Sequence, residues 1–161
     1  MILILRKLLT LLLLMSIYPS LAQYPRKANV AIIESDSIQG THLFGVCTDI
    51  LDSEGYYFFQ SNKDSLSLVT NPIIIHDLPL LFKLEIKVEA SLTTIRGYIM
   101  DDRNFADLGL YDIPKKWEYA AYRSFSGSMW RIGFDVLVEI VELIRSKING
   151  KVTWYRWQDV Q

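Results

Sequence analysis

Residues 80–100 read LLFKLEIKVEASLTTIRGYIM, and this stretch decides the fold class. Apolar and polar side chains alternate from Leu80 to Glu89, which is the period-two pattern of a half-buried β-strand. If Ala90-Ser91 forms a two-residue turn, apolar residues of the two arms face each other, and Glu85 lies opposite Arg96 on the other face. The stretch therefore predicts one long antiparallel hairpin. Because Ala-Ser is a poor turn dipeptide, a longer loop with a shifted register is the alternative.

The segment from Ser128 to Asn149 has the pattern of a long helix. Apolar residues recur at intervals of four and three, and they form a continuous stripe from Trp130 to Ile148. Ser128 is a favourable N-cap, and Asn149-Gly150 is typical of a helix end. An apolar arc this wide predicts a helix that packs on a sheet.

Shorter segments complete the predicted fold. A helix over residues 38–52 is expected, with Asp36 and Gln39 as a capping box, although a strand over residues 41–50 is the alternative. Residues 101–127 have no pattern that decides their structure. Further strands are predicted at residues 29–34, 56–60, 65–70, 73–76 and 151–157. The sequence thus predicts an α+β fold, with an antiparallel sheet of about four to six strands and both helices on one face.

The N-terminus has the three zones of a secretory signal peptide. Arg6 and Lys7 supply positive charge, residues 8–17 are almost wholly apolar, and Ser20 and Ala22 are the small residues that precede a cleavage site. The rival interpretation, a membrane anchor, needs an apolar run of roughly 20 residues, and this run is about half as long. We therefore expect residues 1–22 to be removed. A single domain over residues 23–161 would then lie in the periplasm or outside the cell, with no transmembrane span.

Composition limits the classes of partner. The predicted leader holds two basic and no acidic residues, so its removal changes the formal net charge from −1 to −3. A nearly neutral exported chain is not expected to bind nucleic acid. Cys47 is the only cysteine. It cannot form a disulfide within a monomer, and we expect it to be a small buried residue of the core.

No residue pattern indicates a catalytic site, a metal site or a cofactor. His42 and His76 have no partners at the spacing of zinc ligands. The Asp101, Asp102, Asn104 and Asp107 cluster offers oxygen atoms, but it lacks the glycine and the final glutamate of a calcium-binding EF-hand loop. A solvated acidic turn is the expected structure. The serines in the stretch RSFSGS, residues 123–128, do not match the Gly-x-Ser-x-Gly nucleophile motif.

Three aromatic residues near the C-terminus are the candidate binding residues. In an extended strand, Tyr155 and Trp157 lie on one face and Trp154 lies on the other. Aromatic side chains serve glycan and protein contacts, and they serve hydrophobic cores equally well. Core packing is therefore the alternative role for these three residues.

The order of strand, helix, hairpin, long hairpin and long helix extends over residues 29–149. It is carried by the helix end at residues 52–56, the hairpin into residues 66–70, the strand at residues 82–89 and the helix from Trp130. This arrangement resembles exported bacterial domains of unknown function that have a sheet like that of TATA-binding protein. It also resembles the repeated domain of the outer-membrane assembly lipoprotein BamC. The resemblance implies no catalytic residues. The residue after the predicted cut is Gln23 rather than a cysteine, so lipid attachment is not expected.

Three functions remain open on the sequence alone. The first is a non-catalytic binding module of the cell envelope or secreted fraction, with a protein or glycan partner. The second is a small hydrolase or carbohydrate-active enzyme that uses carboxylates of the loop at residues 101–112. The third is an oligomeric structural subunit, in which the helix from Ser128 packs on its copy.

Overall fold

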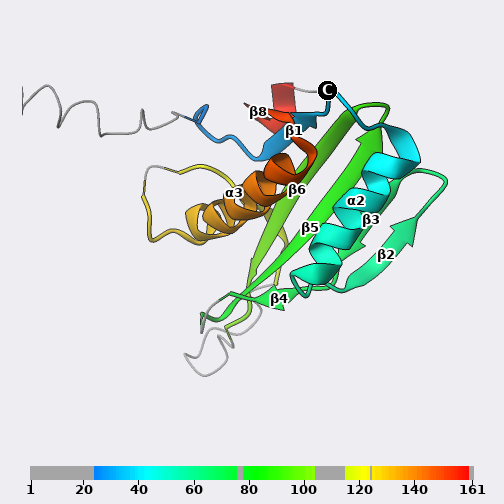
Figure 1. The fold of residues 1–161 in the computed structure, drawn as a ribbon. Helices are drawn as coiled ribbons and strands as arrows, with labels where there is room; N and C mark the ends of the chain where they lie inside the picture. Colours follow the sequence, from blue (N-terminus) through cyan, green and yellow to red (C-terminus); the bar gives the residue numbers. More distant parts are fainter. Residues whose placement is uncertain (1–23, 76–77, 104–114, 124, 160–161) are drawn as a thin grey trace, which may run out of the picture.

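The computed structural model describes residues 24–75, 78–103, 115–123 and 125–159 (Figure 1). The predicted signal peptide at residues 1–22 lies outside the described residues. No helix in the described part of the chain is both long and apolar enough to cross a membrane. The elements in chain order are β1 (Val30–Glu34), α2 (Gly40–Ser53), β2 (Phe58–Asn62), β3 (Ser67–Thr70), β4 (Ile73–Ile74), β5 (Leu80–Glu89), β6 (Leu92–Asp101), β7 (Glu118–Tyr119), α3 (Met129–Ile148) and β8 (Lys151–Tyr155).

The fold is α+β, as predicted. Among the described residues, one antiparallel sheet has the strand order β2-β3-β5-β6-β1-β8, while β4 pairs with β5 and β7 pairs with β6. This sheet of eight strands is larger than the predicted four to six. The strand predicted at residues 73–76 is present as the two-residue β4. The strand that was not predicted is β7, which has two residues and is too short to show an alternating pattern.

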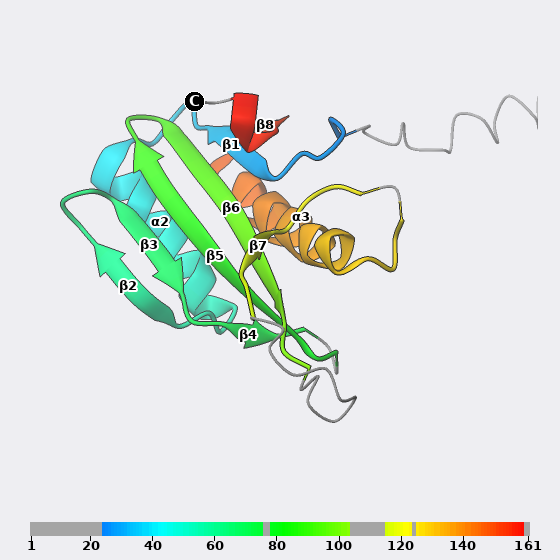
Figure 2. The ribbon, with the colours of Figure 1, turned by 180° about the vertical axis from the view of Figure 1, so that it is seen from behind.

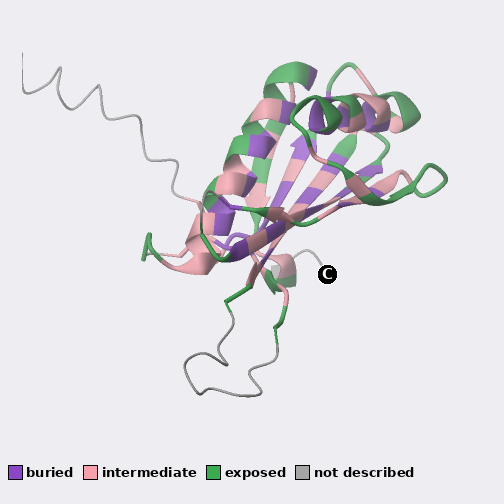
Figure 3. Cartoon of the chain, turned by 90° about the horizontal axis from the view of Figure 1, so that it is seen from below, coloured by how far each residue is buried: buried purple, intermediate pink, exposed green. Residues whose placement is uncertain are grey.

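Helices α2 and α3 lie on the same face of the sheet (Figures 1 and 2). No α-helix of the described residues covers the other face, which we call the helix-free face; the short 3-10 turn at Trp157–Asp159 borders it. Figure 3 shows that buried residues gather between the helices and the strands. Phe82, Leu84 and Ile86 of β5 are fully buried on this side, as are Phe134 and Leu137 of α3. The helix-free face is therefore the surface on which the sheet presents its polar and aromatic residues.

The central hairpin has the predicted register. Ile86 pairs with Ile95 and Glu85 pairs with Arg96 along the whole length of β5 and β6. The turn is the two-residue Ala90-Ser91 turn, and Ala90 adopts a positive φ of 52°. Neighbouring backbone stabilises this unfavourable turn, because the Ala90 carbonyl accepts from the Gly40 N–H at 2.8 Å and the Ser91 carbonyl accepts from the Ser35 N–H at 2.9 Å. The loop before α2 thus holds the hairpin turn in place.

Helix α3 begins and ends at the predicted residues. Ser128 is the N-cap, and its Oγ accepts a hydrogen bond from the Arg131 N–H, while Asn149 ends the helix in the left-handed conformation. Gly133 allows a close approach to β6, since a Cβ atom there would lie 2.9 Å from Cδ1 of Ile99. The apolar stripe of α3 is covered by the sheet of the same chain.

Helix α2 is a helix rather than the alternative strand, but it begins later than predicted. Its N-cap is Gln39, whose side chain makes no capping hydrogen bond, so the predicted capping box is wrong. Ser35 instead accepts a hydrogen bond from the Ile38 N–H at 3.3 Å. Because this bond closes a turn ahead of the helix, the first helical residue is Gly40.

Candidate binding surface

The helix-free face of the sheet carries a continuous group of charged and aromatic side chains. Strand pairing places Lys83 beside Tyr98, and Tyr98 beside Tyr119. In the next row Glu85 lies beside Arg96. We call these five residues, together with Trp117, Tyr155 and Trp157, the open-face cluster.

Cations of this cluster lie against aromatic rings. The Nζ atom of Lys83 lies 4.4 Å from the ring centroid of Trp117, and the guanidinium carbon of Arg96 lies 3.4 Å from that of Trp157. The rings of Tyr98 and Tyr119 are 5.1 Å apart. Such cation–π contacts fix long side chains in one position. The surface is therefore organised before any partner binds.

Glu85 connects the centre of the cluster. Its Oε2 atom accepts a hydrogen bond from the Tyr98 hydroxyl at 2.6 Å and lies 3.5 Å from Nη1 of Arg96. Burial raises the pKa of Tyr98 well above the ordinary tyrosine value, and the bond to Glu85 adds to this effect. The phenol therefore remains a protonated donor. The side chains of Arg96 and Glu85 are 17% and 34% exposed, so this pair is more buried than an ordinary surface ion pair.

The structure separates the three aromatic residues predicted near the C-terminus. Trp154 faces the helices, where its ring lies 5.0 Å from that of Phe134 and 5.3 Å from that of Tyr24. Trp154 therefore packs against the hydrophobic core, which is the alternative role. Tyr155 is exposed and pairs with Val30 on the open face. Trp157 is held there by Arg96 and by a hydrogen bond of 2.7 Å from its backbone N–H to the Asn29 side chain.

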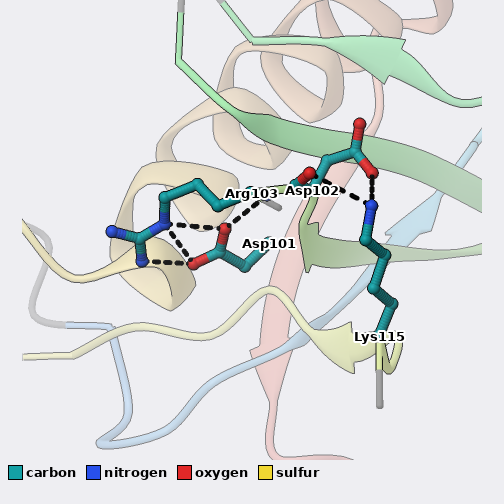
Figure 4. Close-up of polar contacts among 4 residues, drawn as sticks. All are labelled: Asp101, Asp102, Arg103 and Lys115. Carbon is teal, nitrogen blue, oxygen red and sulfur yellow. Dashed lines mark hydrogen bonds and ion pairs between the residues drawn. The ribbon is translucent and has the colours of Figure 1, made fainter. Parts of the chain in front are cut away.

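The described carboxylates of the acidic loop are paired with cations. Asp101 accepts hydrogen bonds from the backbone and side chain of Arg103, and Asp102 lies 2.6 Å from Nζ of Lys115 (Figure 4). The hydrogen bonds from the Arg103 side chain lower the pKa of Asp101. A general acid needs a raised pKa, so Asp101 is unsuited to that role.

The rest of this cluster, Asn104, Asp107 and Asp112, lies outside the described residues. Within the described ranges no three histidine, cysteine or acidic side chains group as metal ligands.

The remaining candidates lie away from the open face. Cys47 is fully buried in the core, as expected, and burial raises the pKa of its thiol to about 11. His42 is exposed on α2. Ser126 lies in the exposed turn before α3. His76 and Ser124 lie outside the described residues.

Comparisons with known proteins find ten similar chains among the solved structures. No family model matches the chain, and no curated protein matches it. A TBP-like protein from Parabacteroides distasonis is similar to it, with a TM-score of 0.44 and 14% sequence identity, over 76% of this chain and 92% of the other. Its description agrees with the resemblance seen in the sequence. At this level of similarity it carries no information on function.

Sequence reasoning missed most of the open-face cluster. Alternation predicts that Lys83 and Glu85 lie on the outer face of the hairpin, but alternation alone does not indicate a binding role. The signal was present in Arg96 and Tyr98, which follow the same alternation on the second arm. Trp117 had no such signal, because it precedes a strand of only two residues.

Proposed function

We propose that this protein is a non-catalytic binding module of the cell envelope or secreted fraction, and that it binds a protein or glycan partner through the open-face cluster. The observation that carries the proposal is the group of four aromatic residues and two cations on a sheet face without helices: Tyr98, Trp117, Tyr119, Trp157, Lys83 and Arg96. Tyrosine, tryptophan and arginine are the residues that most often dominate binding energy at interfaces.

The rigidity of the cluster supports a binding role. Its central residues lie on β5 and β6, which form the longest strands of the sheet. Because Tyr98 and Arg96 are already fixed by Glu85 and Trp157, little side-chain entropy remains to be lost on association. A surface of this kind favours a specific partner over a general adhesive role.

The two other hypotheses have weaker support. The enzyme hypothesis requires free carboxylates, and Asp101 and Asp102 are both paired with cations. The subunit hypothesis requires an apolar stripe on α3 that is free to meet a copy. Phe134, Leu137 and Val141 of that stripe are fully buried within the chain.

Export is part of the proposal. It is supported by the basic, apolar and small-residue zones of residues 1–22. The exported protein is expected to begin at Gln23. N-terminal sequencing of material recovered from the periplasm or medium tests this, and an intact Met1 on exported protein would contradict it.

A retention experiment tests the binding surface. The purified protein is immobilised and incubated with envelope extract of the source cells, beside the double variant Lys83→Glu with Trp117→Ala. Glu139→Lys, on the exposed side of α3, is the matched control. We expect the double variant to lose the retained partner while the control keeps it. Equal retention by all three proteins, or no retained partner at all, would contradict the proposal.

A further inference from the structure

A pocket of about 240 Å³ borders the open-face cluster, where β7, the residues before β1 and the C-terminal turn after β8 meet. Three aromatic side chains line it: Tyr119, Trp130 and Trp157. Sites for drug-sized ligands usually enclose about 300–1,000 Å³. This pocket therefore fits one small group, such as a single sugar ring.

Positive charge is in excess around the pocket. Lys27, Arg123 and Arg156 line it, against Glu118 as the one carboxylate among the described lining residues. That carboxylate accepts a hydrogen bond of 2.7 Å from Nε1 of Trp130. Because three cations stand against one carboxylate, the described lining of the pocket keeps an excess of positive charge.

Arg123 contributes a cation to the pocket wall. Its guanidinium lies 5.1 Å from the ring centroid of Trp130, which holds it in place beside the pocket. The Nε atom is buried and has no acceptor among the described residues, so the donors available to a ligand are the terminal N–H groups of the guanidinium. Such groups bind carboxylates through charge-assisted hydrogen bonds.

Amide side chains at the same pocket can form hydrogen bonds with hydroxyl groups of a ligand. Oδ1 of Asn29 accepts the Trp157 N–H, so the side-chain amide NH₂ of Asn29 remains as a donor. Glu118 adds carboxylate lone pairs, and Gln158 adds an amide NH₂ donor, since its Oε1 atom accepts a hydrogen bond from Arg156. Hydroxyl groups donate and accept hydrogen bonds, and the C–H faces of a sugar ring pack against aromatic rings. The C-terminal carboxylate of a peptide would bind the cations, but it has no hydroxyl groups for the polar side chains and no ring for the aromatic residues.

We propose that the pocket binds the carboxylate-bearing sugar of an acidic glycan. Arg123 and Lys27 hold the carboxylate, Asn29 and Gln158 meet hydroxyls, and the ring packs on Tyr119 and Trp157. This inference rests on the proposed binding function and deepens it, because it names the ligand class for one end of the open face.

Fluorescence titration tests the inference, since Trp130 and Trp157 line the pocket. The purified protein is titrated with the methyl glycosides of glucuronate, galacturonate and sialic acid, and with methyl glucoside as the uncharged analogue. N-acetylglycine and inorganic phosphate serve as other anions. We expect at least one acidic sugar to bind about tenfold or more tightly than the other three probes. The ratio to methyl glucoside corresponds to one charge-assisted hydrogen bond, and the ratio to the two other anions corresponds to the hydroxyl and ring contacts that those anions lack.

Two pocket variants and a control complete the experiment. Arg123→Gln and Lys27→Gln should each weaken acidic-sugar binding about tenfold. Lys87→Gln, an exposed cation of β5 outside the pocket lining, should leave it unchanged. Circular dichroism confirms that each variant is folded, and Lys27 and Arg123 lie on different segments, so both variants are not expected to fail together.

The inference is overturned if no acidic sugar binds, if methyl glucoside binds equally, or if N-acetylglycine or phosphate binds as tightly as the best sugar. The last result would make the pocket a general anion or peptide-terminus site. Retention of the extract partner by Arg123→Gln, with loss in Lys83→Glu/Trp117→Ala, would overturn the sugar inference alone. Retention by both variants would overturn the proposed function as well.

Discussion

Leu137→Ala tests whether the stripe of α3 forms the core on which the open face is built. Leu137 lies in the middle of α3 and is fully buried. The substitution removes three carbon atoms, which at about 0.8 kcal/mol per buried methylene accounts for about 2–2.5 kcal/mol. The cavity left against the sheet adds a further penalty, and measured Leu→Ala costs of about 3–5 kcal/mol include both terms. We expect a loss of about 3–4 kcal/mol.

Urea unfolding measures this loss, with Glu142→Ala as the control. Glu142 is exposed and forms an ion pair with Arg145, whose Nε atom lies 2.6 Å away, so its removal should cost no more than about 0.5 kcal/mol. At a slope of about 1–3 kcal/mol per molar urea, the Leu137→Ala midpoint should fall by about 1 M or more. Equal midpoints for the two variants would refute the reasoning. The stripe would then be a partner surface, and the subunit hypothesis would gain support.

Four further predictions concern packing, burial and helix capping. A Cβ atom at Gly97 would lie 2.8 Å from the buried Phe82 ring, so Gly97→Ala should cost about 1–3 kcal/mol. Gly45 lies on α2 with open space around a Cβ atom, so Gly45→Ala should stabilise the protein by about 0.5–1 kcal/mol. The melting temperature should therefore fall for Gly97→Ala and rise for Gly45→Ala, and a change of the opposite sign, or none, would contradict the prediction for that variant. Because burial raises the Cys47 pKa to about 11, its thiol should resist a disulfide reagent at pH 8 until urea unfolds the protein. Rapid labelling of folded protein would contradict this. Ser128→Ala should lower stability by about 1 kcal/mol through loss of the helix cap, and an unchanged melting temperature would argue against it.

The central hairpin was predictable because its signal is local. Alternation along β5 fixes which residues face the core, and the Glu85–Arg96 pair agrees with the same register. The turn was not predictable with equal certainty. Ala90 adopts an unfavourable positive φ. The backbone N–H groups of Gly40 and Ser35 donate hydrogen bonds to the carbonyls of Ala90 and Ser91, and these donors are distant from the turn in sequence.

The start of α2 shows how a local signal misleads. Ser35, Asp36 and Ser37 are all typical capping residues, and Gln39 is at the spacing of a capping box. The Ser35 side chain instead closes a turn before the helix. Residue type therefore predicted that a helix would follow, but not which residue begins it.

The candidate site was predictable only in part. Alternation separated Trp154 from Tyr155, and the structure agrees. The strand predicted over residues 151–157 ends at Tyr155, and Trp157 reaches the open face from a 3-10 turn rather than from a strand. The contacts that organise the surface were not visible in the sequence, because Arg96 and Trp157 meet only when β8 has paired with β1. Trp117 likewise reaches Lys83 from a segment without periodicity.

Site-specific photo-crosslinking in cells tests the central claim, that the open-face cluster binds a partner. A photoreactive phenylalanine derivative is placed at Tyr119 in the open-face cluster or at Ser146 on the exposed side of α3. We predict a discrete crosslinked product, protein or glycan, from Tyr119 and none from Ser146. Products of equal yield from both positions, or a product from Ser146 alone, would contradict the assignment of the helix-free face as the binding surface.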